Sequence, residues 1–170
     1  INVYEEFDAL ERDKDVQGLL EVLMSNVTDS GLRPIFTLNN IVANPKFNKI
    51  VESDFQDYSF ERFTETLKVY GESSSVVDIC KGGIAEGVFS VEFHGREHLN
   101  VNRWMGALRS GDRLLREAVR EGHITHSGNY PPSGRRDYLD AYGCAYRSQF
   151  ETEEAIITSG LEIFKQVWGF

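Results

Sequence analysis

The sequence has few cysteines, no long apolar run and little positive charge. Its 170 residues include two cysteines, too few for the disulfide framework of a small secreted domain. No apolar stretch approaches the roughly 20 residues that a membrane-spanning helix needs, so we expect no membrane span. Eighteen basic residues against 27 acidic ones give a formal net charge of −9. Because like charges repel, we expect no general binding to nucleic acid, although this balance does not exclude a local basic patch.

Several common functional motifs are also missing from the sequence. It contains neither the G-x-x-x-x-G-K nor the G-x-G-x-x-G phosphate-binding pattern, and it lacks the H-E-x-x-H pattern of zinc proteases. Neither Cys80 nor Cys144 belongs to a C-x-x-C pair, which argues against a zinc knuckle. The sequence leaves open whether these two cysteines pair with each other.

The composition that remains is that of an ordinary folded domain. Hydrophobic residues make up 41% and charged residues 26% of the chain, which is typical of soluble globular proteins. A chain of this length buries about 70% of its unfolded surface, so it can form a core without disulfides. We therefore expect residues 1–170 to form a single domain.

Apolar periodicity predicts an α/β fold. Two short apolar runs, 34–38 and 88–93, predict buried strands, and Asn44 with Pro45 predicts a turn that starts a short helix. Apolar residues at helical spacing predict helices over 15–26, 59–70, 76–86, 100–108, 112–120 and 152–168. In the last of these helices Thr152 is the expected cap, and one side is lined by Ile156, Leu161, Phe164 and Trp168. Strands separated by helices favour a mostly parallel sheet. The low number of strands indicates an incomplete barrel or sheet.

Polar residues follow both predicted strands. Asn39 and Asn40 come directly after the first strand, and the run H-G-R-E-H, 94–98, follows the second. In parallel α/β folds the functional groups gather where strands end. We therefore expect the two strands to pair in parallel, and Asn39 or Asn40 to open into the same cleft as the histidines.

The run 94–98 is the sharpest chemical feature of the sequence. His94 and His98 are four residues apart, so one helical turn would place both imidazoles on one face, where they could bind zinc, iron, nickel or copper. Gly95 permits a close bend, Arg96 could hold a carboxylate or phosphate, and Glu97 could act as a base or as a partner of a histidine. The alternative is that both histidines are structural and bond to backbone carbonyls.

Other candidate residues have a structural interpretation first. His123 and His126 lie in a Gly/Pro-rich loop, where exposed or capping histidines are the simpler interpretation. Trp104 lies on a predicted helix and is either a core residue or a platform for a sugar ring. Cys80 and Cys144 have no histidine beside them, which argues against a catalytic thiol.

The runs FTLNNIVANP (36–45) and FHGREHLNV (93–101), together with Trp104, resemble a bacterial branch related to the polysaccharide deacetylases, family 4 of the carbohydrate esterases. The resemblance implies an irregular (β/α) barrel with helices outside. It also implies a divalent metal, expected to be zinc, held by His94 and His98. The implied activity is metal-dependent hydrolysis that removes N- or O-acetyl groups from a carbohydrate, in the cytoplasm or envelope of a bacterium.

We assign roles to further residues on this basis. Glu97 and Arg96 are the predicted catalytic residues, and Asn39, Asn40 and Trp104 are predicted to bind the carbohydrate. In such a mechanism the metal polarises the acetyl carbonyl and activates a water molecule, and a carboxylate takes the proton. Two alternatives stay open: an inactive carbohydrate-binding relative, and a hydrolase of a non-carbohydrate amide on the same fold.

The chain departs from the deacetylase pattern in three places. Gly95 replaces the usual Ser or Thr between the histidines. The Asp pair that supplies the third metal ligand and the base would precede Ile1, and an Arg-x-Pro-Tyr-like motif would follow Phe170. The resemblance thus covers the middle of a barrel without its first and last strands. Because two imidazoles fall short of the three protein ligands usual for a catalytic metal, we expect the isolated chain to bind metal weakly or not at all.

Overall fold

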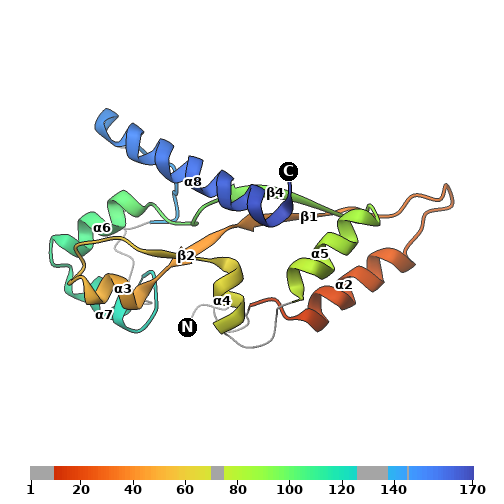
Figure 1. Cartoon of the computed structure of the whole chain (residues 1–170), viewed down its shortest axis with the longest axis horizontal. Helices are drawn as coiled ribbons and strands as arrows, with labels where there is room; N and C mark the ends of the chain where they lie inside the picture. Colours follow the sequence, from red (N-terminus) through yellow and green to blue (C-terminus); the bar gives the residue numbers. More distant parts are fainter. Residues whose placement is uncertain (1–9, 70–74, 126–137, 145) are drawn as a thin grey trace, which may run out of the picture.

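The computed structural model describes residues 10–69, 75–125, 138–144 and 146–170 (Figure 1). Its strands are β1 (Phe36–Ile41), β2 (Ala43–Pro45), β3 (Phe60–Arg62) and β4 (Phe89–Gly95). Its helices are α2 (Asp13–Ser25), α3 (Phe47–Glu52), α4 (Phe63–Val69), α5 (Val76–Ala85), α6 (Val101–Arg109), α7 (Arg113–Arg120) and α8 (Phe150–Trp168), with a 3-10 turn η1 (Arg147–Gln149). These elements confirm the predicted α/β class.

The strands form two small sheets. β1 and β4 pair in parallel, with Asn39 opposite Glu92 and Asn40 opposite Phe93, as the helical segments between them predicted. β2 and β3 pair antiparallel in a separate two-stranded sheet, so the prediction of mostly parallel strands holds for only one of the two sheets. Over the described ranges each strand has a single neighbour, so the structure shows no closed barrel there.

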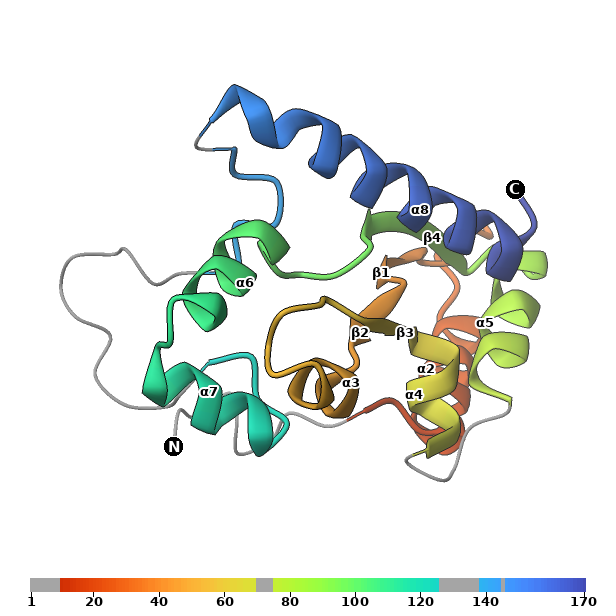
Figure 2. The same ribbon diagram turned by 60° about the vertical axis from the view of Figure 1, so that its left-hand side comes forward.

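One hydrophobic core surrounds the parallel sheet. α5 packs on α2 and on β4, and the C-terminal half of α8 lies along β4 (Figures 1 and 2). This core contains Val16 of α2, Cys80 of α5, Val91 of β4 and Trp168 of α8. Apolar residues at helical spacing on three helices thus meet the apolar strand that the sequence predicted.

A second core lies around α3, α6 and α7. Trp104, Leu108 and Val119 are fully buried there, and Ile156 of α8 joins them. Asn100 and Asp112 accept hydrogen bonds from the backbone of Arg103 and Leu115, so they cap α6 and α7. Side-chain oxygens at these positions stabilise helix starts because the first backbone N–H groups have no partner within the helix.

The predicted helix over 59–70 is wrong in its first part. Phe60–Arg62 form β3, which pairs with β2, and α4 begins at Phe63. Phe60, Phe63 and Leu67 have helical spacing, but the hydrogen bonds to a strand far away in sequence decide the conformation of the first three residues. The turn predicted at Asn44 and Pro45 is likewise part of β2, and the short helix α3 follows it.

The start and the buried face of α8 also differ from expectation. The helix begins at Phe150 after Gln149, so Thr152 is not its cap. Leu161, which the spacing placed on the buried side, is 47% exposed. Gly160 takes the buried position beside it because a side chain there would collide with Phe93 and Arg96. In the part of the chain that the structure describes, no helix combines the length and apolar character needed to cross a membrane.

Candidate functional site

The two predicted strand ends lie side by side. Asn39 and Asn40 at the end of β1 face Glu92 and Phe93 of β4, and His94 follows directly. Asn39 is exposed. Asn40 is used within the fold, because its Oδ1 accepts a hydrogen bond of 2.9 Å from Nε1 of Trp168 on α8. Of the two predicted asparagines, Asn39 is therefore the one with a solvent-facing amide.

His94 and His98 lie on one face, as their spacing predicted. Their rings stack with a centroid distance of 5.5 Å and an angle of 12° between the planes. Both residues are exposed. The geometry differs from the expected helical turn, because His94 still belongs to β4 and a bend after Gly95 brings His98 back beside it.

Gly95 makes this bend possible. Its φ of +139° is a backbone conformation that residues with a side chain rarely adopt. A Cβ atom at this position would lie 2.9 Å from Oη of Tyr142 and 3.2 Å from the carbonyl oxygen of Glu97. A glycine between the two histidines thus fits the local path of the chain.

Arg96 and Glu97 point into the protein and bind each other. They are 7% and 3% exposed. Nε of Arg96 donates to both carboxylate oxygens of Glu97, at 2.7 and 2.9 Å. Tyr58 donates its hydroxyl to Oε1 of Glu97 at 2.8 Å, and Nη1 of Arg96 donates to Oγ of Ser159 at 3.0 Å.

Aromatic rings and burial set the electrostatics of this network. The Arg96 guanidinium lies 4.4 Å from the ring centroid of Phe60 and 5.7 Å from that of Tyr58. Burial raises the pKa of the Glu97 carboxyl, although Arg96 acts in the opposite direction. Burial, and then the Glu97 charge, raise the pKa of the Tyr58 hydroxyl well above its usual value, which keeps the donor proton in place.

The network joins the segment after β4 to the loop before β3 and to α8. Its members Tyr58 and Ser159 were not found from the sequence, because they lie 39 and 63 residues from their partners and carry no local signal. The catalytic roles predicted for Arg96 and Glu97 stay predictions. In this conformation both side chains hold the fold together below the exposed histidines.

Trp104 is a core residue in the structure. It is fully buried, and its Nε1 donates to the carbonyl oxygen of Ile124 at 2.8 Å. Its ring meets those of Phe47 and Tyr58 edge to face, with centroids 6.5 and 6.4 Å away. Trp104 therefore lies in the hydrophobic core, and no face of its ring is open to a sugar.

The described residues do not complete a catalytic metal centre. Within them, no group of three or more His, Cys, Asp or Glu side chains could hold a metal ion, so His94 and His98 have no third ligand of this kind. His126 lies outside the described residues, and His123 is exposed. We therefore derive no reaction step through a metal.

The cysteines give no reactive site either. Cys80 and Cys144 are both free thiols. Burial raises the pKa of Cys80 to about 11, so this thiol is protonated at neutral pH. Because the thiolate is the nucleophile, Cys80 packs in the core as a small apolar residue.

Comparison with known proteins adds one similarity. The serine/threonine-protein phosphatase with EF-hands 2 of Mus musculus is 28% identical to this chain over 119 residues, which is 69% of the chain. The matched region spans 13% of the length of the mouse protein. No family model matches the chain. No solved structure matches it either.

Proposed function

We propose that this chain is a phosphoester-recognising domain related to serine/threonine-protein phosphatases, with its ligand site at the ends of β1 and β4. The observation that carries the proposal is the similarity to the mouse phosphatase over 69% of the chain. The parallel pairing of β1 and β4 supports it, because α/β proteins place ligands outside the carboxyl ends of parallel strands.

The exposed groups at this edge suit a phosphoester. His94 and His98 present imidazole N–H donors, and Asn39 at the end of β1 adds an exposed amide. A phosphate monoester carries strong acceptor oxygens and negative charge, which such donors bind. Because no group of three or more metal-binding side chains lies among the described residues, the proposal is recognition of the phosphoester.

The test is a titration of the whole chain with O-phosphoserine, followed through the imidazole proton resonances. We expect the signals of His94 and His98 to shift, and His94→Ala or His98→Ala to weaken binding at least tenfold. His123→Ala is the matched control, since it removes an exposed imidazole away from this edge. Unshifted signals of His94 and His98, or equal losses in all three variants, would contradict the proposal.

A second candidate is the metal-dependent carbohydrate deacetylase that the sequence resemblance implies, with its irregular (β/α) barrel. The stacking of His94 and His98 at the end of β4 favours it, because two histidines on one face are what that metal site needs. Release of acetate from acetylated chito-oligosaccharides by the zinc-loaded chain, lost in His94→Ala, would support this activity. Carbohydrate binding without acetate release would instead indicate the inactive relative.

A further inference from the structure

Three arginines gather around one loop of this acidic protein. Residues 53–57 connect α3 to the segment before β3, and within this loop Asp54 and Phe55 have positive φ values of 51° and 61°. The ring of Phe55 is almost fully buried, at 1% exposure. The guanidinium carbons of Arg116 and Arg120 lie 4.7 and 5.1 Å from the centroid of that ring.

Arg109 completes the cluster from the end of α6. Its Nε and Nη2 both donate to the carbonyl oxygen of Gln56, at 3.0 and 2.7 Å. Arg116 donates Nε to the carbonyl oxygen of Leu108 at 2.8 Å. These bonds use only part of the five N–H groups of each guanidinium, and they leave the positive charges in place.

The charges of this cluster have no carboxylate partner among the described residues. Arg113 of the same helix pairs with Glu117 at 3.5 Å, whereas no ion pair joins Arg109, Arg116 or Arg120 to an acidic side chain in those ranges. Three neighbouring cations repel one another, so a bound anion would stabilise them. The loop at the centre of the cluster also carries two exposed acidic residues, Asp54 and Asp57, and neither forms an ion pair with the three arginines within the described residues.

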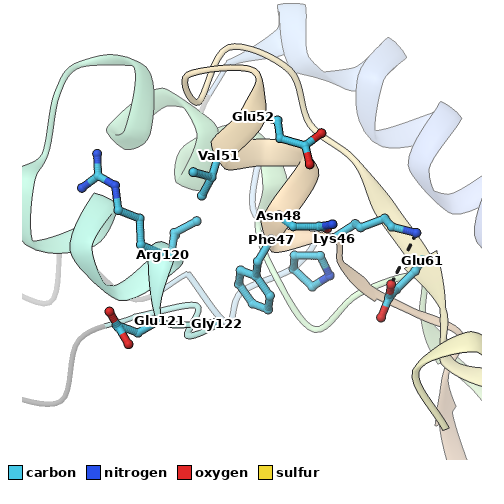
Figure 3. Close-up of a pocket in the computed structure, with 11 residues that line it drawn as sticks. Lys46, Phe47, Asn48, Val51, Glu52, Glu61, Arg120, Glu121 and Gly122 are labelled. Carbon is cyan, nitrogen blue, oxygen red and sulfur yellow. Dashed lines mark ion pairs between the residues drawn. The ribbon is translucent and has the colours of Figure 1, made fainter. Parts of the chain in front are cut away.

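A pocket of about 590 Å³ lies beside this cluster, between α3 and α7 (Figure 3). It is lined by Pro45, Lys46, Phe47, Asn48, Val51, Glu52, Glu61, Val119, Arg120, Glu121 and Gly122. Apolar side chains of α3 and α7, such as Val51 and Val119, form part of its wall. Figure 3 shows Arg120 on the side opposite the Lys46–Glu61 ion pair, whose atoms are 3.7 Å apart.

We propose that this pocket and the arginine cluster form a docking site for a phosphorylated peptide. The guanidinium groups of Arg116 and Arg120 bind the phosphoryl group, and the pocket takes an apolar side chain near it in the peptide. The volume lies within the range of ligand pockets, and arginine is the residue best suited to phosphate recognition. The site differs from the strand-end site proposed above, and it does not depend on that proposal.

The experiment measures binding of a fluorescein-labelled peptide with phosphoserine and a leucine two residues after it, by fluorescence anisotropy with the whole chain. We expect the phosphorylated peptide to bind at least tenfold more tightly than its serine form. Arg120→Glu should weaken binding at least tenfold. Arg113→Glu is the matched control, because it makes the same charge change on the same helix away from Phe55, and it should change affinity less than threefold.

Two further variants make the outcome decisive. Glu121→Lys adds positive charge beside the pocket and should strengthen binding. The comparison is repeated in the His94→Ala background, where the strand-end site has lost a donor, and Arg120→Glu should still weaken binding at least tenfold. Equal binding of the phosphorylated and serine peptides, or equal losses in Arg113→Glu and Arg120→Glu, would overturn the proposal. Displacement of the peptide by an equimolar amount of inorganic phosphate would also overturn it, because the site would then bind a simple anion.

Discussion

Arg96 and Glu97 form a buried ion pair, and their burial determines how much each of them contributes to stability. Removing two charges from water costs free energy, and a buried ion pair recovers this cost only when further hydrogen bonds and close contacts complete it. Here Tyr58 and Ser159 supply the hydrogen bonds, and the Phe60 ring lies against the guanidinium. The ion pair therefore stabilises the fold only while both of its partners are present.

Removal of Arg96 should therefore destabilise the protein strongly. In Arg96→Met the Glu97 carboxylate loses the partner that both of its oxygens contact. We expect the free energy of unfolding at pH 7 to fall by about 3–5 kcal/mol, measured by urea denaturation. Arg33→Met is the control, because the exposed Arg33–Glu86 pair at 3.6 Å contributes at most about 1 kcal/mol. Similar losses in both variants would contradict the buried network.

The pH dependence of stability tests the same carboxyl group. Burial raises the pKa of Glu97 in the folded chain, so the folded state holds this proton more tightly than the unfolded state does. The stabilisation that this proton gives the folded state is complete when the pH lies below the pKa of Glu97 in the unfolded chain, about 4.3. It is lost as the pH rises through the pKa of Glu97 in the folded chain. The stability advantage of the wild type over Glu97→Gln should therefore shrink across this window. Urea unfolding of both proteins at several pH values measures it, and an advantage that grows with pH would refute the assignment.

At the residue scale, the part of the candidate site that could be predicted from the sequence is its local part. The spacing of His94 and His98 predicted that their rings share one face, and the structure stacks them. The spacing did not show that a side chain at position 95 would collide with Tyr142, or that Arg96 points inward and donates to Ser159. The motif at 94–98 gives no sign of these contacts, because the residues that make them lie far away in the sequence.

At the scale of elements, the two glycines of α5 illustrate how one helix is fitted to a strand. Gly82 and Gly83 both weaken a helix, because glycine loses more backbone freedom than other residues. A side chain at Gly83 would overlap the Phe89 ring of β4, whereas a side chain at Gly82 would meet no atom within 4 Å. Gly83 therefore allows α5 to approach β4, and Gly82 has no such role in this packing.

Alanine substitutions should separate these two glycines. Gly83→Ala should lower the free energy of unfolding by about 1–3 kcal/mol, because it overpacks the contact between α5 and β4. Gly82→Ala should raise it by about 0.5–1 kcal/mol, because alanine favours the helix at an open position. Thermal or urea unfolding of the two variants measures both signs. A stabilising Gly83→Ala would show that α5 does not pack on Phe89 this closely.

Helices with clear start signals were predictable, and the short strands were not. The predicted ranges of α6 and α7 begin at Asn100 and Asp112, and these two side chains cap the helices in the structure. β3 has three residues with helical apolar spacing, and its conformation depends on the partner strand β2. Local sequence patterns reflect hydrogen bonds between residues that are close in sequence, whereas β3 is defined by its hydrogen bonds to β2. A strand of three residues can therefore be identified only together with its partner strand.

At the scale of the whole molecule, α8 connects the two hydrophobic cores. Ile156 packs in the core around Trp104, while Ile163, Phe164 and Trp168 pack in the core around the parallel sheet. Figure 2 shows α8 running from the side of α6 to the side of α5. The sequence predicted one apolar face on this helix, but it could not show that the face serves two cores, because that depends on where the other elements lie.

The two tryptophans allow this coupling to be measured, since Trp104 lies in one core and Trp168 in the other. Single-tryptophan variants Trp104→Phe and Trp168→Phe report each core by fluorescence, and far-ultraviolet circular dichroism reports the helices. If α8 couples the cores, the fluorescence and helix signals should give one urea midpoint within each variant.

Breaking α8 between its two contact regions should separate these transitions. Thr158 is exposed and lies between Ile156 and Ile163, so a proline there disrupts the helix, at a cost of about 3 kcal/mol or more, without removing a core side chain. Thr158→Pro, or the milder Thr158→Gly, should shift the Trp104 and Trp168 midpoints apart. Thr158→Ala keeps the helix and should preserve a single midpoint. Coincident transitions in the proline variant would show that the two cores are coupled through contacts other than α8.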